Sequence, residues 1–160
     1  MEETLKPSIP SKVKFFAWRA LHDCIPCHVI LANKHITNIV TCPMCQSVAE
    51  DIKHALFSCN RAKEVWTSLG VWGHIDRMQM MDRSGSVIVQ EIIKDGGEVR
   101  ELKLGRAELL LTGCWYIWWQ RRQLVHGEDI QNPSRSALSI AAITTNYSVA
   151  SKMGAVINQG

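Results

Sequence analysis

Apolar residues recur at helical spacing along most of the chain, and this pattern predicts a mostly α-helical protein. Within residues 11–22, Phe15, Trp18 and Leu21 recur at three-residue steps. They predict a helix with these side chains on its buried side, and with Phe16 and Ala20 alongside them. Ser11 is suited to cap the start of this helix, because its side chain can accept a hydrogen bond from a free backbone N–H. Pro26 follows the helix and marks its end.

Further helices are expected in later parts of the chain. The pattern predicts a short helix over residues 28–34, a helix over 50–66 with a break near Cys59, a long helix over 98–125 and a last helix over 133–152. Gly127 is placed to cap the long helix, and Pro133 suits the first position of the last one. Buried candidates on the last helix are Ala137, Leu138, Ile140, Ala141 and Ile143.

Residues 71–97 interrupt this pattern. Glycine and serine punctuate them, and the one convincing apolar run covers residues 87–93, which favours a helix over a strand. We therefore expect residues 71–97 to connect an N-terminal helical domain with a two-helix C-terminal extension.

Length and charge narrow the choice of protein class. A chain of 160 residues suits one domain, or one small domain with an appendage. The net charge of +3 permits contact with nucleic acid without demanding it. The longest uncharged apolar stretch, residues 109–119, is too short to span a bilayer, and no secretory signal opens the chain. We therefore expect an intracellular protein of the nucleus or cytoplasm, neither secreted nor bound to a membrane.

Three cysteines and one histidine form a metal-binding pattern. Cys42, Cys45, His54 and Cys59 follow the spacing C-x2-C-x8-H-x4-C, in which a C-x2-C turn brings two thiolates to one point. Three sulfurs and one imidazole nitrogen suit tetrahedral Zn²⁺ and leave no position for a water, so the site is expected to be structural. The alternative is that the cysteines are small buried apolar residues.

A second cluster, at Cys24, Cys27 and His28, leaves several interpretations open. The sequence C-x-x-C-H matches the attachment motif of c-type haem and also a redox pair, but neither a secretory signal nor a βαβ unit accompanies it. A second zinc site would need His22 or His35 as a fourth ligand. The simplest interpretation is structural, with Cys27 at the start of the short helix and Cys24 packed beneath it.

Basic and aromatic residues together are candidates for contact with nucleic acid. The basic candidates are Lys12, Lys14, Arg19, Arg121 and Arg122. Aromatic rings beside arginine can stack on bases while the cations neutralise phosphates. Trp115, Trp118 and Trp119 have the spacing of a buried helical stripe, however, and we expect them in the core, as we do Cys114.

Motifs of common enzyme classes are missing from the sequence. It contains no G-x-x-x-x-G-K-[ST] loop, no G-x-S-x-G elbow and no H-E-x-x-H pair, and its acidic residues are dispersed. We therefore expect a protein that is not an enzyme.

Three of these segments together resemble a known family. Residues 9–20 (IPSKVKFFAWRA), the Cys/His set and residues 62–66 (AKEVW) resemble the reverse-transcriptase zinc-binding domain of plant LINE-type, non-LTR, retrotransposon polyproteins and of host genes derived from them. The resemblance covers residues 7–70. Residues 115–127 (WYIWWQRRQLVHG) are similar to the tryptophan-rich helix that follows the domain, where the family usually has Arg-Asn instead of Arg121-Arg122.

The resemblance implies a fold, a cofactor and a function. It implies that Cys42, Cys45, His54 and Cys59 hold zinc, and it places Cys27 where the family commonly has a threonine cap. We expect a small zinc-stabilised helical domain at 7–70, a connecting segment at 71–97 and a tryptophan-rich helical extension at 98–152. The implied function is a non-catalytic, accessory RNA- or DNA-binding piece of retrotransposon origin, carried as a fragment or a small host gene. The alternative is a protein-interaction or scaffold fragment that uses the tryptophan-rich helix.

Overall fold

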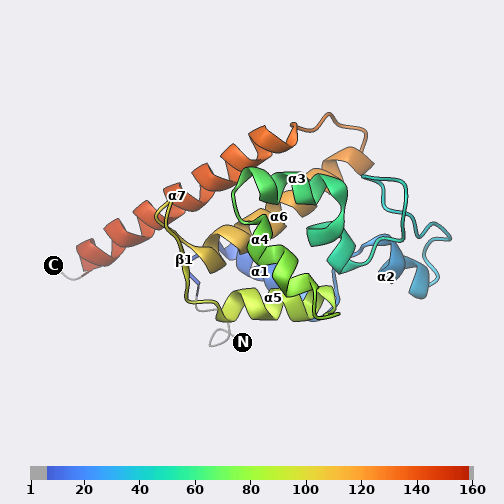
Figure 1. Cartoon of the computed structure of the whole chain (residues 1–160), viewed down its shortest axis with the longest axis horizontal. Helices are drawn as coiled ribbons and strands as arrows, with labels where there is room; N and C mark the ends of the chain where they lie inside the picture. The colour runs from blue at the N-terminus through green and yellow to red at the C-terminus, as the bar shows by residue number, and fades with distance from the viewer. Residues whose placement is uncertain (1–6, 159–160) are drawn as a thin grey trace.

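Helices make up most of the chain from residue 7 to residue 158, the part that the computed structural model describes (Figure 1). The mostly α-helical fold predicted from the sequence is thereby confirmed. In chain order the elements are α1 (Ser11–Leu21), α2 (His28–Asn33), the π-helix η2 (His54–Ser58), α3 (Asn60–Ser68), α4 (Trp72–Gln79), α5 (Gly85–Lys94), β1 (Glu98–Val99), β2 (Leu104–Gly105), α6 (Arg106–Val125) and α7 (Pro133–Asn158). No helix of this described part is long and apolar enough to cross a bilayer.

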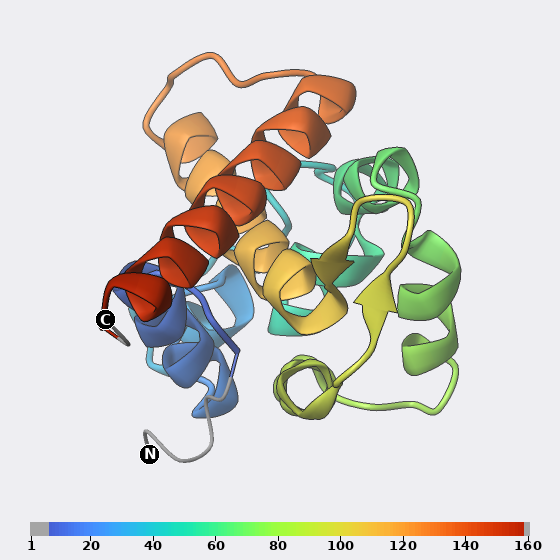
Figure 2. The same cartoon turned by 90° about the vertical axis from the view of Figure 1, so that its left-hand side faces the viewer.

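Helix α6 occupies the centre of the fold. It contacts α1, α5, η2 and α7, and it lies behind α7 in the middle of Figure 2. Its buried residues lie all around the helix axis. A helix that is enclosed on every side needs no polar face. At Gly113, an added Cβ would lie 2.6 Å from the ring of Trp66, so glycine makes room for this ring against α6. The buried apolar side chains of residues 7–158 form one continuous cluster around α6.

Helix α1 buries Phe16 and Ala20, as expected, but leaves Phe15 exposed. Val13, Phe16, Ala17 and Ala20, at i, i+3, i+4 and i+7, are buried, whereas Phe15 is 61% exposed. The expected N-cap also moves: Pro10 holds that position with φ −58°, and Ser11 is the first helical residue. The face with Phe15 and the face with Phe16 are both apolar. Contact with α5 and α6 buries the face with Phe16.

Two helices occupy the segment that we expected to be connecting structure. Helix α5 confirms the helical interpretation of residues 87–93; it begins where Ser84 Oγ accepts a hydrogen bond from Val87 N at 3.3 Å, and it buries Ile88 and Ile92. Helix α4 was not predicted. The division into segments 7–70, 71–97 and 98–152 remains a prediction.

A small β-hairpin replaces the predicted start of the long helix. Residues 98–105 form β1 and β2, which pair antiparallel with Val99 opposite Leu104, and α6 begins only at Arg106. The ion pair between Arg106 and Asp95, with Nε and Oδ2 2.6 Å apart, closes the hairpin at its base. The helix end agrees with the prediction, since Gly127 has φ +80° and its N–H donates to Leu124 O.

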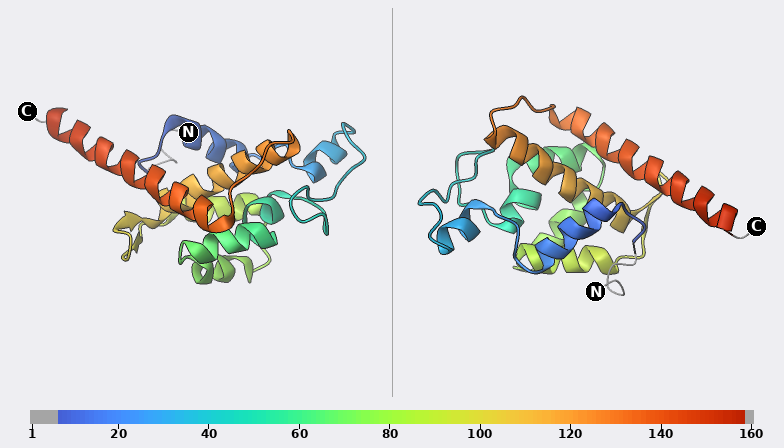
Figure 3. Two further views of the ribbon diagram at one scale, coloured as in Figure 1. Left: turned by 90° about the horizontal axis from the view of Figure 1, so that it is seen from above. Right: turned by 180° about the vertical axis from the view of Figure 1, so that it is seen from behind.

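Helix α7 starts as expected at Pro133 and runs beyond the predicted end. Asn132 caps it, because its Oδ1 accepts a hydrogen bond from Arg135 N at 2.9 Å. Ala137 and Ile140 pack inward, but Leu138, expected in the core, is 71% exposed. The first half of α7 lies against α3 and α6, while its C-terminal part extends past the helical body (Figure 3).

Candidate metal centre

The first two cysteines of the candidate centre lie in a tight loop. Cys42 N donates to Val48 O at 2.8 Å, and Gln46 N donates to Cys42 O at 2.9 Å, so the chain reverses between them. Gln46 takes a positive φ of 57° in this reversal. The backbone N–H groups of Met44 and Cys45 hydrogen-bond to the Cys42 sulfur, an effect that opposes the net rise in the pKa of this thiol. The loop is thus arranged to support a thiolate.

The other two candidate ligands come from consecutive helical segments. His54 begins η2, and its backbone N–H donates to Asp51 Oδ1 at 2.7 Å. Cys59 separates η2 from α3, at the break that the sequence predicts. The backbone N–H groups of Arg61 and Ala62, in the first turn of α3, hydrogen-bond to the Cys59 sulfur. A helix N-terminus stabilises negative charge, which favours a thiolate at this position.

The four side chains converge. The ligand atoms of Cys42, Cys45, His54 and Cys59 all lie within 4.8 Å of one another, and Cys45 Sγ is 3.3 Å from His54 Nε2. Tetrahedral zinc with bonds of about 2.0–2.3 Å needs ligand atoms about 3.5–4 Å apart, so small shifts would accommodate the ion. With Nε2 on the metal, His54 Nδ1 carries the proton and donates to Ser58 Oγ at 3.3 Å, which orients the ring. The residues present fit Zn²⁺.

Two of the sulfurs are already coupled to each other. A hydrogen bond between Cys42 and Cys59 raises the pKa of Cys42, as does its burial, and the same bond lowers the pKa of Cys59. Of the two thiols, Cys59 is therefore the more acidic. Zinc binding replaces this shared proton, because thiolates are the metal ligands.

A family comparison agrees with this geometry. The family described as zinc-binding in reverse transcriptase matches residues 1–66 of the chain, which include all four converging side chains. This part of the chain is similar to the zinc-binding domain of reverse transcriptases. No curated protein and no solved structure matches the chain.

The second cysteine cluster has a structural arrangement. Cys27 is buried as the N-cap residue of α2, and burial raises the pKa of its thiol. His28 Nδ1 lies 2.6 Å from Thr41 O, at the base of the loop that carries Cys42. Cys24 is exposed, with its Sγ 3.2 Å from His22 O, so the expectation that it packs beneath α2 is wrong. Within residues 7–158, the one group of side chains placed to hold a metal is the set at Cys42, Cys45, His54 and Cys59.

The structure separates Arg121 from the other basic candidates. Its side chain is 8% exposed, and it donates from Nε and Nη2 to the carboxylate of Glu50, which is completely buried. Arg121 also lies over the Trp118 ring at 4.6 Å. The proposal that Arg121 meets a phosphate is therefore corrected: its charge is already neutralised inside the fold. Of the remaining candidates, Lys12 and Arg122 are exposed, and Lys14 and Arg19 are half-buried.

Glu50 is a structural residue that the sequence analysis missed. In addition to Arg121, its carboxylate accepts a hydrogen bond from His28 N at 2.8 Å, and its backbone oxygen accepts from Val29 N at 2.9 Å. Glu50 N in turn donates to Val40 O. Glu50 thereby ties α2, the loop before Cys42 and α6 to the segment that leads to His54.

The tryptophans of α6 divide between core and surface. Trp118 is buried and Trp115 half-buried, as is consistent with a core stripe, and Cys114 is buried as expected. Trp119 departs from the expectation, because it is 39% exposed. Lys12 of α1 places its Nζ 4.5 Å from the Trp115 ring centre, so the two helices meet at this surface.

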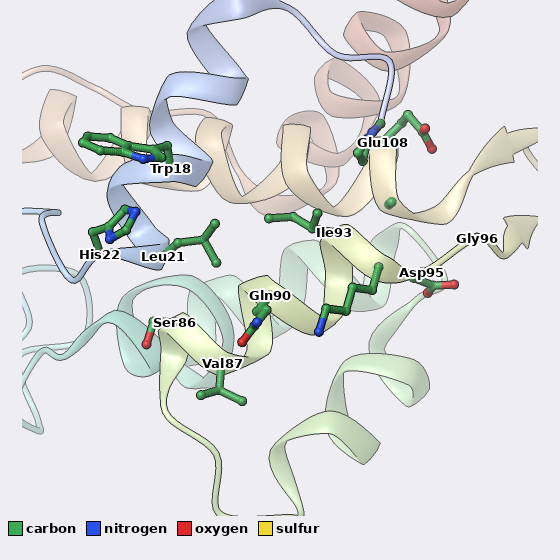
Figure 4. A pocket seen from close by; sticks show the side chains of 13 residues that line it. Trp18, Leu21, His22, Ser86, Val87, Gln90, Ile93, Asp95, Gly96 and Glu108 are labelled. Carbon is green, nitrogen blue, oxygen red and sulfur yellow. The ribbon is translucent and has the colours of Figure 1, made fainter. Parts of the chain in front are cut away.

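A cleft of about 780 Å³ lies between α1, α5 and the start of α6. Figure 4 shows Trp18 and His22 on one wall and Ser86 and Gln90 on the other, with Glu108 at one end. Ser86 Oγ lies 3.1 Å from Ser84 Oγ rather than near a histidine, and Glu108 accepts a hydrogen bond from a backbone N–H. The described lining residues contain no nucleophile paired with a base.

Proposed function

We propose that this protein is a non-catalytic, zinc-stabilised accessory module that binds RNA or DNA in the nucleus or cytoplasm, derived from a LINE-type retrotransposon polyprotein. The observation that carries the proposal is the placement of Lys12 and Arg19 on α1 and of Arg122 on α6, two helices that contact each other. Lys12 touches Trp115, and Arg122 lies on the same face of α6 as that ring, seven residues on. Three cations from two helices thus gather on one side, where they can contact successive phosphates.

Zinc supplies stability in this proposal. Four protein ligands fill a tetrahedral coordination sphere, which leaves no position for a substrate or an activated water. The ion holds the Cys42 loop against the starts of η2 and α3. Glu50 then connects the loop and α2 to α6, the helix that carries Arg122.

The non-catalytic part of the proposal has two supports. The candidate metal centre is closed, and the described residues of the large cleft offer no nucleophile with a base. The carboxylate of Asp95 at the cleft is paired with Arg106. An enzyme would need a convergent set of reactive groups.

A binding titration tests the proposal. We expect the zinc-loaded protein to bind labelled RNA and DNA oligonucleotides at low salt, with little dependence on sequence and with an affinity that falls linearly on a plot of log K against log salt. Neutralising Lys12, Arg19 and Arg122 together should make the slope of this plot less steep by about three, because each lost phosphate contact contributes about one. Absence of binding at low salt would contradict the function.

A protein-interaction role is the second candidate. It is favoured by the apolar side chains that α7 leaves exposed, listed here: Leu138, Val149, Met153, Val156 and Ile157. Five large apolar side chains exposed on one helix are a candidate docking surface. Self-association of the purified protein at micromolar concentration, lost in Leu138→Lys with Val149→Lys, would support this role.

A further inference from the structure

Exposed aromatic rings lie between the basic side chains of α1 and α6. We name the set Lys12, Phe15, Arg19, Trp115, Trp119 and Arg122 the α1–α6 face. On α1, residues 12, 15 and 19 are separated by three and four positions, and on α6, residues 115, 119 and 122 by four and three, so each trio occupies one side of its helix. The two helices are in contact and lie on the same side of the molecule (Figure 3, right).

The rings of this face are ordered by their neighbours. Trp115 and Trp119 stack with ring centres 6.4 Å apart and planes 17° apart. The buried Tyr116 packs against Trp119, with ring centres 5.4 Å apart. Phe15 lies 6.3 Å from Trp18 with planes 21° apart. Each exposed ring is therefore fixed along one side by another ring and open to solvent on the other. Fixed rings lose little conformational entropy when a flat ligand stacks on them.

A cation lies near the Trp115 ring and another near the Phe15 ring. Lys12 Nζ lies 4.5 Å from the Trp115 ring centre, and the Arg19 guanidinium lies 6.0 Å from that of Phe15. Arg122 is exposed three residues after Trp119. Glu108, the acidic residue on this side of α6, sits in the first turn of the helix, at the opposite end from Arg122. Positive charge therefore continues from Lys12 toward Arg122, in the direction away from Glu108.

We propose that the α1–α6 face binds single-stranded nucleic acid, with bases stacked on Phe15 and Trp119 and with phosphates at Lys12, Arg19 and Arg122. The inference rests on the proposed function and specifies its ligand and its site. Unpaired bases expose the flat surfaces that aromatic side chains stack on, whereas a duplex presents mainly its backbone. Alternation of rings and cations matches the alternation of bases and phosphates along a single strand.

The test compares a single strand with a duplex. Phe15→Ala and Trp119→Ala are made separately, and fluorescence anisotropy measures binding to a labelled 12-nucleotide oligouridine or oligothymidine strand and to a 12-base-pair duplex. We expect each variant to bind the single strand about five- to a hundredfold more weakly. Duplex binding and the salt slope should remain unchanged, because the phosphate contacts are retained. Phe15→Trp should keep wild-type affinity, since it retains a ring.

Two matched variants control for surface changes. Leu138→Ala removes an exposed apolar side chain from α7, and Lys14→Ala removes one positive charge from the other side of α1, about 200° around the helix from Lys12. Leu138→Ala should leave binding unchanged. Lys12→Ala should lower the salt slope by about one, and Lys14→Ala by less. Circular dichroism and zinc content establish that each variant is folded.

The outcomes separate this inference from the proposed function. If salt-dependent binding persists and the alanine variants bind the single strand as tightly as wild type, the stacking site is overturned and the function stands. Equal weakening for strand and duplex also overturns the site. If neither nucleic acid binds at low salt, both fail, and a protein partner is then the ligand to seek for this face.

Discussion

Arg121 on α6 and Glu50, just before η2, form a bidentate ion pair in the core, with Nε–Oε2 and Nη2–Oε1 distances of 2.9 and 2.6 Å. The two residues are 71 positions apart in the sequence. The pair connects the segment that leads to His54 with the tryptophan-rich helix. The zinc-binding part of the chain and its C-terminal extension are therefore joined by a contact that neither part could make alone.

Breaking this ion pair should strongly destabilise the protein. We expect Arg121→Met to lower the free energy of unfolding by about 3–5 kcal/mol, because it leaves the Glu50 carboxylate buried without a counter-charge. Urea unfolding measures the effect. Arg122→Met, on the adjacent exposed residue, is the control and should change stability by less than about 0.5 kcal/mol. Equal, small effects of both variants would contradict the assignment of Arg121 to the core.

Zinc removal should unfold much of the N-terminal part. Structural zinc sites have binding free energies of about 10–16 kcal/mol, comparable with or larger than the stability of a domain. We therefore expect one zinc per chain, loss of helical circular dichroism on chelation, and the same loss in Cys59→Ser. Cys24→Ser, which changes an exposed cysteine outside the cluster, should retain the zinc. Two zinc ions per chain would instead assign a metal to Cys24 and Cys27.

The pair between Asp95 and Arg106 should make stability depend on pH. Hydrogen bonds from Arg106 hold the pKa of Asp95 below its usual value, and burial lowers the pKa of the adjacent His74. Both groups bind protons less readily when folded, so stability should rise with pH from about 3 to about 6.5. Asp95 contributes the acid end of this range, and its contribution is lost as the pH falls through its lowered pKa.

Asp95→Asn isolates this contribution. We expect it to cost about 1–3 kcal/mol at pH 7, because Arg106 loses a charged partner, and to flatten the pH dependence below about pH 4. Thermal unfolding across this pH range measures the difference in stability between wild type and variant. Any acid-induced release of zinc affects both proteins and cancels in this difference. Asp76→Asn, on an exposed carboxylate of α4, provides the comparison. A parallel shift of the two curves at every pH would contradict the assigned role of Asp95.

Two glycines in long helices should respond in opposite directions to alanine. In Gly113→Ala the new methyl would lie 2.6 Å from the buried Trp66 ring, so we expect a loss of about 1–3 kcal/mol from forced movement of α3 against α6. In Gly154→Ala nothing lies within 4 Å of the added methyl. This change should stabilise α7 by about 0.5–1 kcal/mol, because alanine favours a helix interior. Chemical unfolding distinguishes the two, and similar effects would argue against the close helix contact.

The sequence predicts the features that depend on local spacing. The convergence of Cys42, Cys45, His54 and Cys59 follows from a tight turn and consecutive helical segments. The cap at Gly127 and the helix start at Pro133 depend only on adjacent residues. Features that depend on tertiary contact were missed. Nothing near Glu50 in the sequence indicates that its partner is Arg121, and an arginine in the run Gln-Arg-Arg-Gln resembles a solvent-exposed residue.

Helix α1 shows the same limit within a single element. Its sequence has apolar residues on two overlapping faces, one with Phe15 and Trp18 and one with Val13 and Phe16. Periodicity alone cannot choose between them, and packing against α5 and α6 buries the second. The face with Phe15 is therefore left at the surface. The hairpin at residues 98–105 was likewise missed because two-residue strands have no periodicity to detect.

The distribution of thiols has a practical consequence for labelling. Cys27 and Cys114 are buried, burial raises the pKa of both, and three further sulfurs belong to the candidate zinc cluster. With zinc bound, a maleimide dye should therefore attach at Cys24 alone. Cys24 lies at the end of α1, where its carbonyl accepts a hydrogen bond from Arg19. A fluorophore at that point would report the binding of a labelled oligonucleotide by energy transfer between the two dyes, and no engineered cysteine would be needed.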